Sequence, residues 1–204
     1  MDRAEAVGRL VPVFRRYGYE GATLARISEA TGLGRASLYH HFPKGKQEMA
    51  AAVLAYVNQW FKVTILDPLC DSGQPIERLE AMTENLQTFY RSGRDSCLLS
   101  IFSLGEANDL FHDHIHQALS AWISALAAIV TESGVAATIA HQRAEEAVML
   151  VQGALILARG LDDVATFERA VRGLPTRLLT SAPPAGLPAA MVTASPSQKY
   201  DCDR

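Results

Sequence analysis

The sequence predicts an all-α protein, with a small N-terminal unit of three short helices and a larger C-terminal helical bundle. Apolar residues recur every three or four positions along most of the 204 residues, which is the period of amphipathic helices. No segment shows a convincing strand period, and glycines divide the first 45 residues into short helices. Because 49% of the residues are hydrophobic and the net charge is only −3, the composition excludes a disordered chain.

The first helix is predicted from an apolar stripe near the N-terminus. Val7, Leu10, Val11, Phe14 and Tyr17 follow the helical spacing and share one face. The helix should end at Gly18, because glycine tolerates the left-handed conformation that closes helices. This stripe needs a partner elsewhere in the fold.

Two shorter helices follow. Thr23 can cap the second helix, which should end at Thr31-Gly32. The third is expected over residues 35–41, because proline at position 43 disfavours helix at the residue before it. Helix, glycine turn and helix together have the spacing of a helix-turn-helix, with Leu38 and Phe42 holding the third helix to the core.

Longer helices are predicted for the rest of the chain. They cover about 47–65, 75–92, 98–104, 109–132, 136–160 and 162–179, and Ile76, Leu79, Met82, Leu86 and Phe89 should form the buried face of the second of them. From residue 181 the chain is rich in proline, alanine and serine without periodicity, which predicts a disordered tail. The predicted domains are therefore residues 1–46, residues 47–180 and the tail 181–204.

The third helix has the composition of a DNA-reading helix. A helix presented by its first residues fits the major groove of duplex DNA, where arginine can bind guanine and hydroxyls can reach phosphates. The charge is also uneven, with +3 on residues 1–50 and −6 on the remainder. The predicted DNA contacts are Arg35, Ala36, Ser37, Tyr39, His40 and Lys46, with Thr23, Arg26 and Lys44 behind them.

The run from Thr23 to Glu48, ending Ser-Leu-Tyr-His-His-Phe-Pro-Lys-Gly-Lys-Gln-Glu, resembles the DNA-binding domain of TetR-family transcriptional regulators. The segment between Phe42 and Lys46 is one residue longer than the family's usual spacing, which puts in doubt which lysine contacts phosphate. This Phe-Pro-x-Gly-Lys form and the later Cys-Leu-Leu-Ser-Ile-Phe-Ser-Leu-Gly-Glu run at 97–106 resemble the LmrA and YxaF branch.

The resemblance implies a repressor that a small molecule releases from DNA. Residues 121–130 and 147–158 are apolar almost all round, so they should be buried in the core or against a second subunit. The family favours a homodimer, whose two recognition helices would read a palindromic operator. The expected effector is apolar or aromatic, and the guessed pocket residues are Trp60, Phe89, Phe102, Phe111, Trp122 and Gln152.

Alternative functions rest on weaker patterns. His112 and His116 share a helical face and could bind a transition metal, and Cys97 could sense thiols or oxidants. A hydrolase or a helical adaptor protein remains possible from the residues alone, although the nucleophile and phosphate-loop motifs of enzymes are missing. We expect no cofactor and, since no signal peptide or membrane-spanning run is evident, a cytoplasmic location without membrane attachment.

Overall fold

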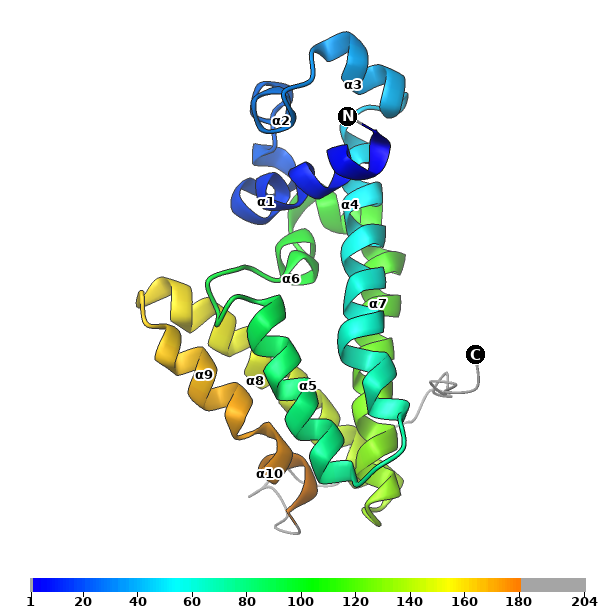
Figure 1. Cartoon of the computed structure of the whole chain (residues 1–204), viewed down its shortest axis with the longest axis vertical. Coiled ribbons are helices and arrows are strands. Elements are labelled where there is room, and N and C mark those ends of the chain that lie inside the picture. Colours follow the sequence, from blue (N-terminus) through cyan, green and yellow to red (C-terminus); the bar gives the residue numbers. More distant parts are fainter. Residues whose placement is uncertain (1, 181–204) are drawn as a thin grey trace.

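The protein is all-α, as the sequence predicts. The structure, a computed structural model, describes residues 2–180, so the expected tail at 181–204 lies outside the described residues. Within this range every regular element is a helix. Figure 1 shows the N-terminal helices capping an elongated bundle whose long axis is followed by α4 and α7.

The N-terminal cap contains α1 (Arg3–Gly21), α2 (Leu24–Thr31) and α3 (Arg35–His41). In α1 the chain kinks at Gly18, which has a φ of 67°, and helix then continues to Gly21 rather than ending at the kink. Val7, Leu10 and Phe14 are buried as expected, while Val11 and Tyr17 are half-buried and still pack against the core. Val13 before the kink and Tyr19 after it are buried as well.

Helix α4 (Lys46–Phe61) connects the two parts of the molecule. It begins beside α1, where Met49, Ala50 and Val53 are buried, and it continues through a π-helical turn (Lys62–Leu66) into a 3-10 turn (Asp67–Cys70). The predicted boundary at residues 46 and 47 therefore falls in the first turn of one continuous rod. By length and composition residues 46–70 could cross a membrane, a property that core helices of globular proteins share. Here the rod packs against α1 and α7.

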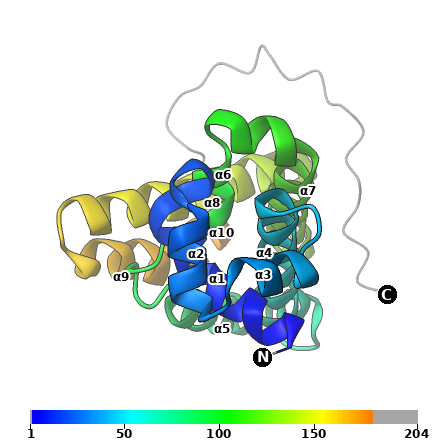
Figure 2. The ribbon, with the colours of Figure 1, turned by 90° about the horizontal axis from the view of Figure 1, so that it is seen from above.

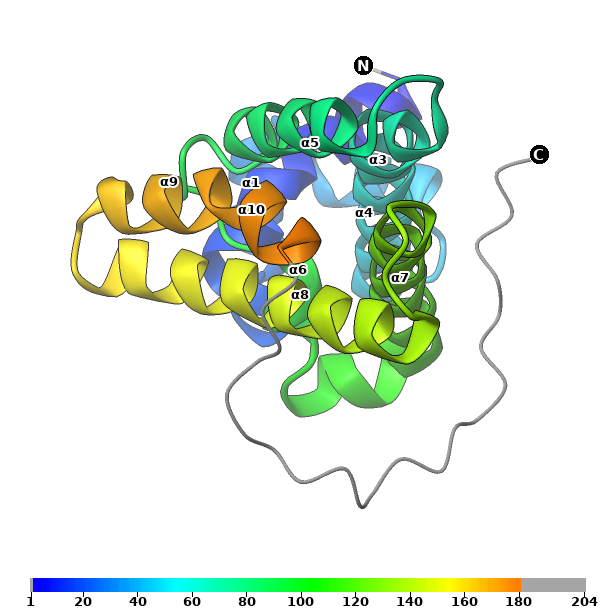
Figure 3. The ribbon, with the colours of Figure 1, turned by 90° about the horizontal axis from the view of Figure 1, so that it is seen from below.

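The C-terminal bundle contains α5 (Pro75–Phe89), α6 (Leu98–Phe102), α7 (Gly105–Glu132), α8 (Ala137–Gly160), α9 (Val164–Arg172) and α10 (Leu174–Leu179). Figure 3 shows α9 and α10 lying between α5 and α8. The predicted last helix is divided in two at Gly173, just before Pro175. Leu79, Met82, Leu86 and Phe89 are buried in α5, whereas Ile76 in its first turn is 39% exposed.

An aromatic cluster joins the N-terminal cap to the bundle. Phe14 and Tyr19 of α1 meet Phe102 of α6 and Phe111 of α7, with ring centroids 5.6 to 6.3 Å apart and mostly edge-to-face. Such contacts bury large apolar rings in a preferred geometry. Beside the cluster, Arg15 of α1 forms a 2.6 Å ion pair with Asp95, which lies between α5 and α6. The apolar face of α1 therefore packs against both α4 and the C-terminal bundle.

Candidate nucleic-acid interface and cavity

Hydrogen bonds at both ends of α2 shape the helix-turn-helix. Thr23 caps the start of α2 by accepting a hydrogen bond from the Arg26 amide, as predicted. At its end Gly32 adopts the left-handed conformation (φ 71°), and its amide donates to the Ser28 carbonyl. The Ser28 hydroxyl donates to the Leu33 carbonyl at 2.6 Å. These bonds fix the direction in which α3 leaves the turn.

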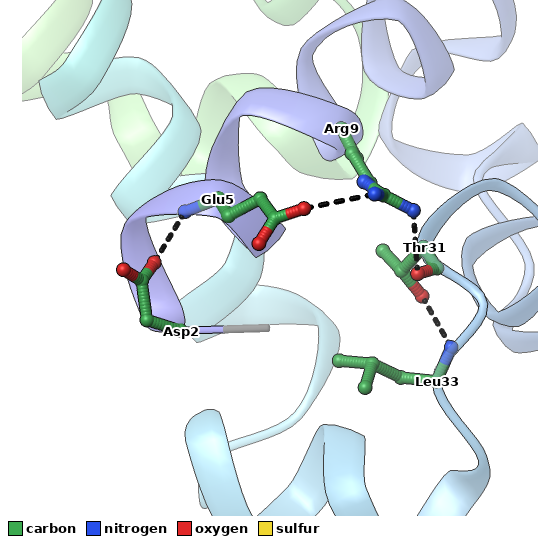
Figure 4. Close-up of polar contacts among 5 residues, drawn as sticks. All are labelled: Asp2, Glu5, Arg9, Thr31 and Leu33. Atoms are coloured by element: carbon green, nitrogen blue, oxygen red, sulfur yellow. Dashed lines mark hydrogen bonds and ion pairs between the residues drawn. The ribbon is translucent and has the colours of Figure 1, made fainter.

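A second network holds this turn to α1. In Figure 4 the Arg9 guanidinium reaches from α1 to the Thr31 carbonyl (3.3 Å) while also pairing with Glu5 (2.8 Å). The Thr31 hydroxyl accepts from the Leu33 amide at 3.3 Å, and Asp2 caps α1 through the Glu5 amide at 2.8 Å. Arg9 therefore links α1 to the end of α2 and helps to hold the two helices in position.

Helix α3 divides cleanly into a buried side and an exposed side. Leu38 and the following Phe42 are fully buried, which confirms that they anchor the helix. The five predicted DNA contacts on the helix are all exposed: Arg35, Ala36, Ser37, Tyr39 and His40. Figure 2, viewed from above, shows α2 and α3 outermost at this end of the molecule. Nothing in the described part of the chain covers the polar side of α3.

The predicted phosphate contacts occupy different settings. Lys44 is exposed, while Lys46 is half-buried with its ammonium 4.2 Å from the centre of the Tyr19 ring. Gly45 between them has a φ of 66° and packs against the Tyr39 ring, so the longer connection is accommodated by a left-handed glycine. Glu48 accepts from the Lys44 amide (2.9 Å) and pairs with Arg3 (3.3 Å).

The two contacts predicted from α2 are also at the surface. Thr23 is exposed, although its hydroxyl already caps α2. Arg26 donates to the Gly21 carbonyl at 2.7 Å, and its guanidinium lies 4.1 Å from the centre of the Tyr17 ring. To reach a phosphate, Arg26 would have to share these contacts.

This helix-turn-helix is matched by a known family. Residues 11–53 match the family described as bacterial regulatory proteins, tetR family, and residues 75–173 match the LmrA/YxaF-like transcriptional regulator C-terminal domain. The chain belongs to the TetR family. As a TetR-family member it is a DNA-binding transcriptional regulator and not an enzyme, which removes the hydrolase alternative.

Individual relatives agree with this assignment. The chain is 22% identical over 161 residues to the HTH-type transcriptional regulator LmrA of Bacillus subtilis, covering 77% of this chain and 86% of that protein. It is 21% identical to the uncharacterized HTH-type regulator YxaF of the same organism, covering 72% and 78%. A TetR regulator structure from Legionella pneumophila shares the fold with a TM-score of 0.73 at 20% identity, covering 83% of this chain and 93% of that one.

In the TetR C-terminal bundle a partly open cavity of about 310 Å³ lies between α4, α5 and α7. Its walls are largely aromatic, because Phe61 packs edge-on against both Phe89 and Trp122 with centroids about 5 Å apart. Further lining residues are Tyr90 and Cys97 from the segment between α5 and α6, and Leu98 and Leu99 from the first turn of α6. The volume lies at the lower end of the range for small-molecule sites.

Only part of the guessed pocket lines this cavity. Phe89 and Trp122 belong to the lining. Trp60 does not; it is 45% exposed, and its ring lies 4.8 Å from the Phe89 ring at a tilt of 38°. Phe102 and Phe111 belong to the aromatic cluster at the domain junction instead. Gln152 bonds to Ser100 (3.1 Å) and to the Cys97 sulfur (3.4 Å), behind the lining.

The polar lining was missed from the sequence. Asn58 and Gln59 contribute from α4, Lys62 contributes from the π-helical turn that follows it, and His114 and Gln117 contribute from α7. His114, Gln117, Ala118 and Ala121 recur at helical spacing, so the face of α7 could have been recognised as one surface. Its role was hidden because the opposing wall comes from α4, more than 50 residues earlier in the chain.

The cavity lining includes the buried hydroxyl of Tyr90. Burial raises the pKa of Tyr90 well above the usual value near 10, and a hydrogen bond with the Cys97 side chain raises it further. The phenol therefore remains protonated and can serve as a hydrogen-bond donor. Cys97 is buried among apolar neighbours, a setting in which thiols are usually unreactive.

The three histidines of the cluster on α7 are all exposed. His114 also contributes to the cavity lining, whereas the rings of His112 and His116 lie 6.4 Å apart outside it. Among residues 2–180 no group of three or more His, Cys, Asp or Glu side chains is arranged to hold a metal ion.

Proposed function

We propose that this TetR-family regulator is a ligand-responsive repressor that binds a palindromic operator as a homodimer in the cytoplasm. Residues 1–46 would form the DNA-binding domain and residues 47–180 the effector-binding and dimerisation domain. The observation that carries the proposal is α3, whose apolar residues are buried while its polar residues remain exposed and uncovered. A relative supports repression over activation, since 42 residues of the chain are 48% identical to the HTH-type transcriptional repressor AcnR of Corynebacterium efficiens.

DNA recognition is proposed to use the exposed side of α3. Arg35, at the start of the helix, has the donor geometry for guanine, and Ser37, Tyr39 and His40 can reach base edges or phosphates. Ala36 offers apolar contact to a thymine methyl. Thr23, Arg26, Lys44 and Lys46 surround this surface and would bind the phosphate backbone.

Selection of bound duplexes from a random DNA library tests operator recognition. We expect a palindromic consensus whose half-sites are centred about 34 Å apart, one helical turn. Affinity for the selected duplex should fall steeply with salt, whereas a shuffled duplex should bind weakly at every salt concentration. Failure to enrich any sequence with folded protein would contradict the proposal.

The proposed dimer interface is the exposed apolar stripe of α8. Met149, Ile156 and Leu157 are 63%, 58% and 51% exposed in the single chain, and Gly153 and Gly160 lie beside them. The all-round apolar pattern of this helix is explained if the inner side packs on α7 and α9 and the outer side on a second copy. Light scattering should give a dimer mass at micromolar concentration, and Leu157→Asp should give a monomer mass, with exposed Glu145→Gln on the same helix as control.

The ligand response is proposed to act through the cavity. Since α4 supplies one wall and also begins inside the N-terminal cap, a ligand that changes the spacing of α4 and α7 would tilt the DNA-binding helices. Its effect would be limited by its differential affinity for the two states. A screen of small molecules against the operator complex tests this step, and filling the cavity by Ala118→Trp should mimic or block the response.

A further inference from the structure

Every charged or titratable contribution to the cavity lining is basic or neutral. The lining contains Lys62 and His114 but no aspartate or glutamate, and its remaining polar groups are the amides of Asn58, Gln59 and Gln117, the Tyr90 phenol and the Cys97 thiol. The side-chain amides can donate or accept hydrogen bonds, whereas the Lys62 ammonium only donates. The lining therefore offers a cationic donor and no anionic acceptor, which favours a ligand that brings acceptors.

We infer that the effector is an amphipathic aromatic anion, with an apolar ring system in the aromatic part of the cavity and a carboxylate, sulfonate or phenolate at the Lys62 and His114 side. This inference rests on the proposed ligand response and specifies its chemistry. Phe61, Phe89 and Trp122 pack edge-to-face in the lining and offer an aromatic surface, which suits a flat apolar body. Polar groups of α7 and of the rod that begins with α4 line the same cavity.

Two features of Lys62 bear on this assignment. Its ammonium already pairs with Asp67 at 2.6 Å, and its side chain is 45% exposed. An ammonium has three donors, so an incoming anion can share it with Asp67. Because the pair is at the surface, the anion would gain a charge-assisted hydrogen bond without the full cost of burying a charge.

A cationic ligand would meet the opposite conditions. Entering the cavity would remove water from its charge, while the lining itself holds no carboxylate and the nearby Asp67 carboxylate is already paired with Lys62. Aromatic rings do attract cations, but Lys62 would repel one at the same site. The structure therefore predicts an order of affinity: anion first, then the neutral aromatic, then the cation.

Three probes of matched size test this order on the full-length protein by fluorescence titration. They are 8-anilino-1-naphthalenesulfonate, the neutral N-phenyl-1-naphthylamine and a naphthyltrimethylammonium cation. We expect the sulfonate to bind at least about tenfold tighter than the neutral probe, which corresponds to one charge-assisted hydrogen bond. Competition between the two probes, and loss of both in Ala118→Trp, would assign the signal to the cavity rather than to the α8 stripe.

Variants separate the charge effect from the shape of the cavity. Lys62→Met and His114→Gln should each weaken the sulfonate several-fold while leaving the neutral probe within twofold. His116→Gln is the matched control, since His116 lies two residues away on the same helix, is exposed like His114 and does not line the cavity. Equal binding of all three probes, or tighter binding of the cation, would overturn the inference and leave the ligand response intact. Absence of any cavity binding would overturn both.

Discussion

The ion pair between Arg15 and Asp95 should be the most costly polar contact to break among those that join the two parts of the molecule. Arg15 Nη1 lies 2.6 Å from Asp95 Oδ2, and the two side chains are only 10% and 22% exposed. The guanidinium also lies over the Phe89 ring, 5.5 Å from its centre. Its Nε and Nη2 atoms have no hydrogen-bond partner among the described residues, so Asp95 is the main compensation for a buried charge.

Replacing Asp95 by asparagine keeps the shape and removes the charge. Breaking one side of a buried pair costs about 3–5 kcal/mol in general. Because Asp95 retains some solvent and asparagine can still accept a hydrogen bond, we expect the lower end, about 3 kcal/mol. For a chain of this size that loss lowers Tm by roughly 6–12 °C.

Urea unfolding of the single and double variants of Arg15 and Asp95 measures how much their ion pair contributes to the free energy of unfolding. Asp95→Asn should lower the free energy of unfolding strongly, while adding Arg15→Met should restore part of it, because methionine keeps the apolar stem over Phe89 without a charge. Glu5→Gln is the control, since the Glu5–Arg9 pair is half-exposed and should contribute only about 0.5 kcal/mol. If Asp95→Asn unfolds within about 0.5 kcal/mol of the unaltered protein, the view of Arg15 as a buried, dependent charge is refuted.

The remaining predictions concern DNA contacts and backbone strain. Arg35→Ala should weaken operator binding by about 1–3 kcal/mol and relax base preference at one position in each half-site; unchanged preference in a repeated selection would remove Arg35 from the base-reading residues. Lys46→Ala should weaken all duplexes alike and reduce the salt slope by about one, and if Lys44→Ala does so instead, the longer connection has moved the phosphate contact. Gly93→Ala should cost about 3 kcal/mol in urea unfolding, because φ is +88° and a Cβ would lie 2.7 Å from Phe167. Gly8→Ala, a helical position with open space around it, should instead be neutral or slightly stabilising.

The N-terminal unit could be predicted from the sequence because local signals determine it. Thr23, Gly32 and Pro43 set helix ends within a few residues of themselves, and the spacing of Leu38 and Phe42 sets the buried side of α3. The main local error was at Gly18, where the positive φ kinks α1 without ending it. Tyr19 after the kink is buried, whereas Tyr17 before it is half-buried.

The cavity could not be predicted to the same extent, because it depends on how distant helices meet. Trp60 and Phe61 are adjacent in sequence, yet a helix turns by about 100° per residue, so only Phe61 faces the cavity. Phe102 and Phe111 are aromatic, as pocket-lining residues often are, but they pack against Phe14 and Tyr19 of α1 at the domain junction. Aromatic content alone does not distinguish a lining residue from a junction residue.

The aromatic cluster at the junction limits how the operator specificity of this protein can be exchanged for that of a relative. Phe14 and Tyr19 belong to the DNA-binding part by sequence, but they complete a core with Phe102 and Phe111. A chimera that imported residues 1–46 wholesale would bring foreign side chains into that core and would unfold or uncouple the protein. Grafting only the exposed residues of α3 should transfer the reading of DNA while keeping the original response to the effector.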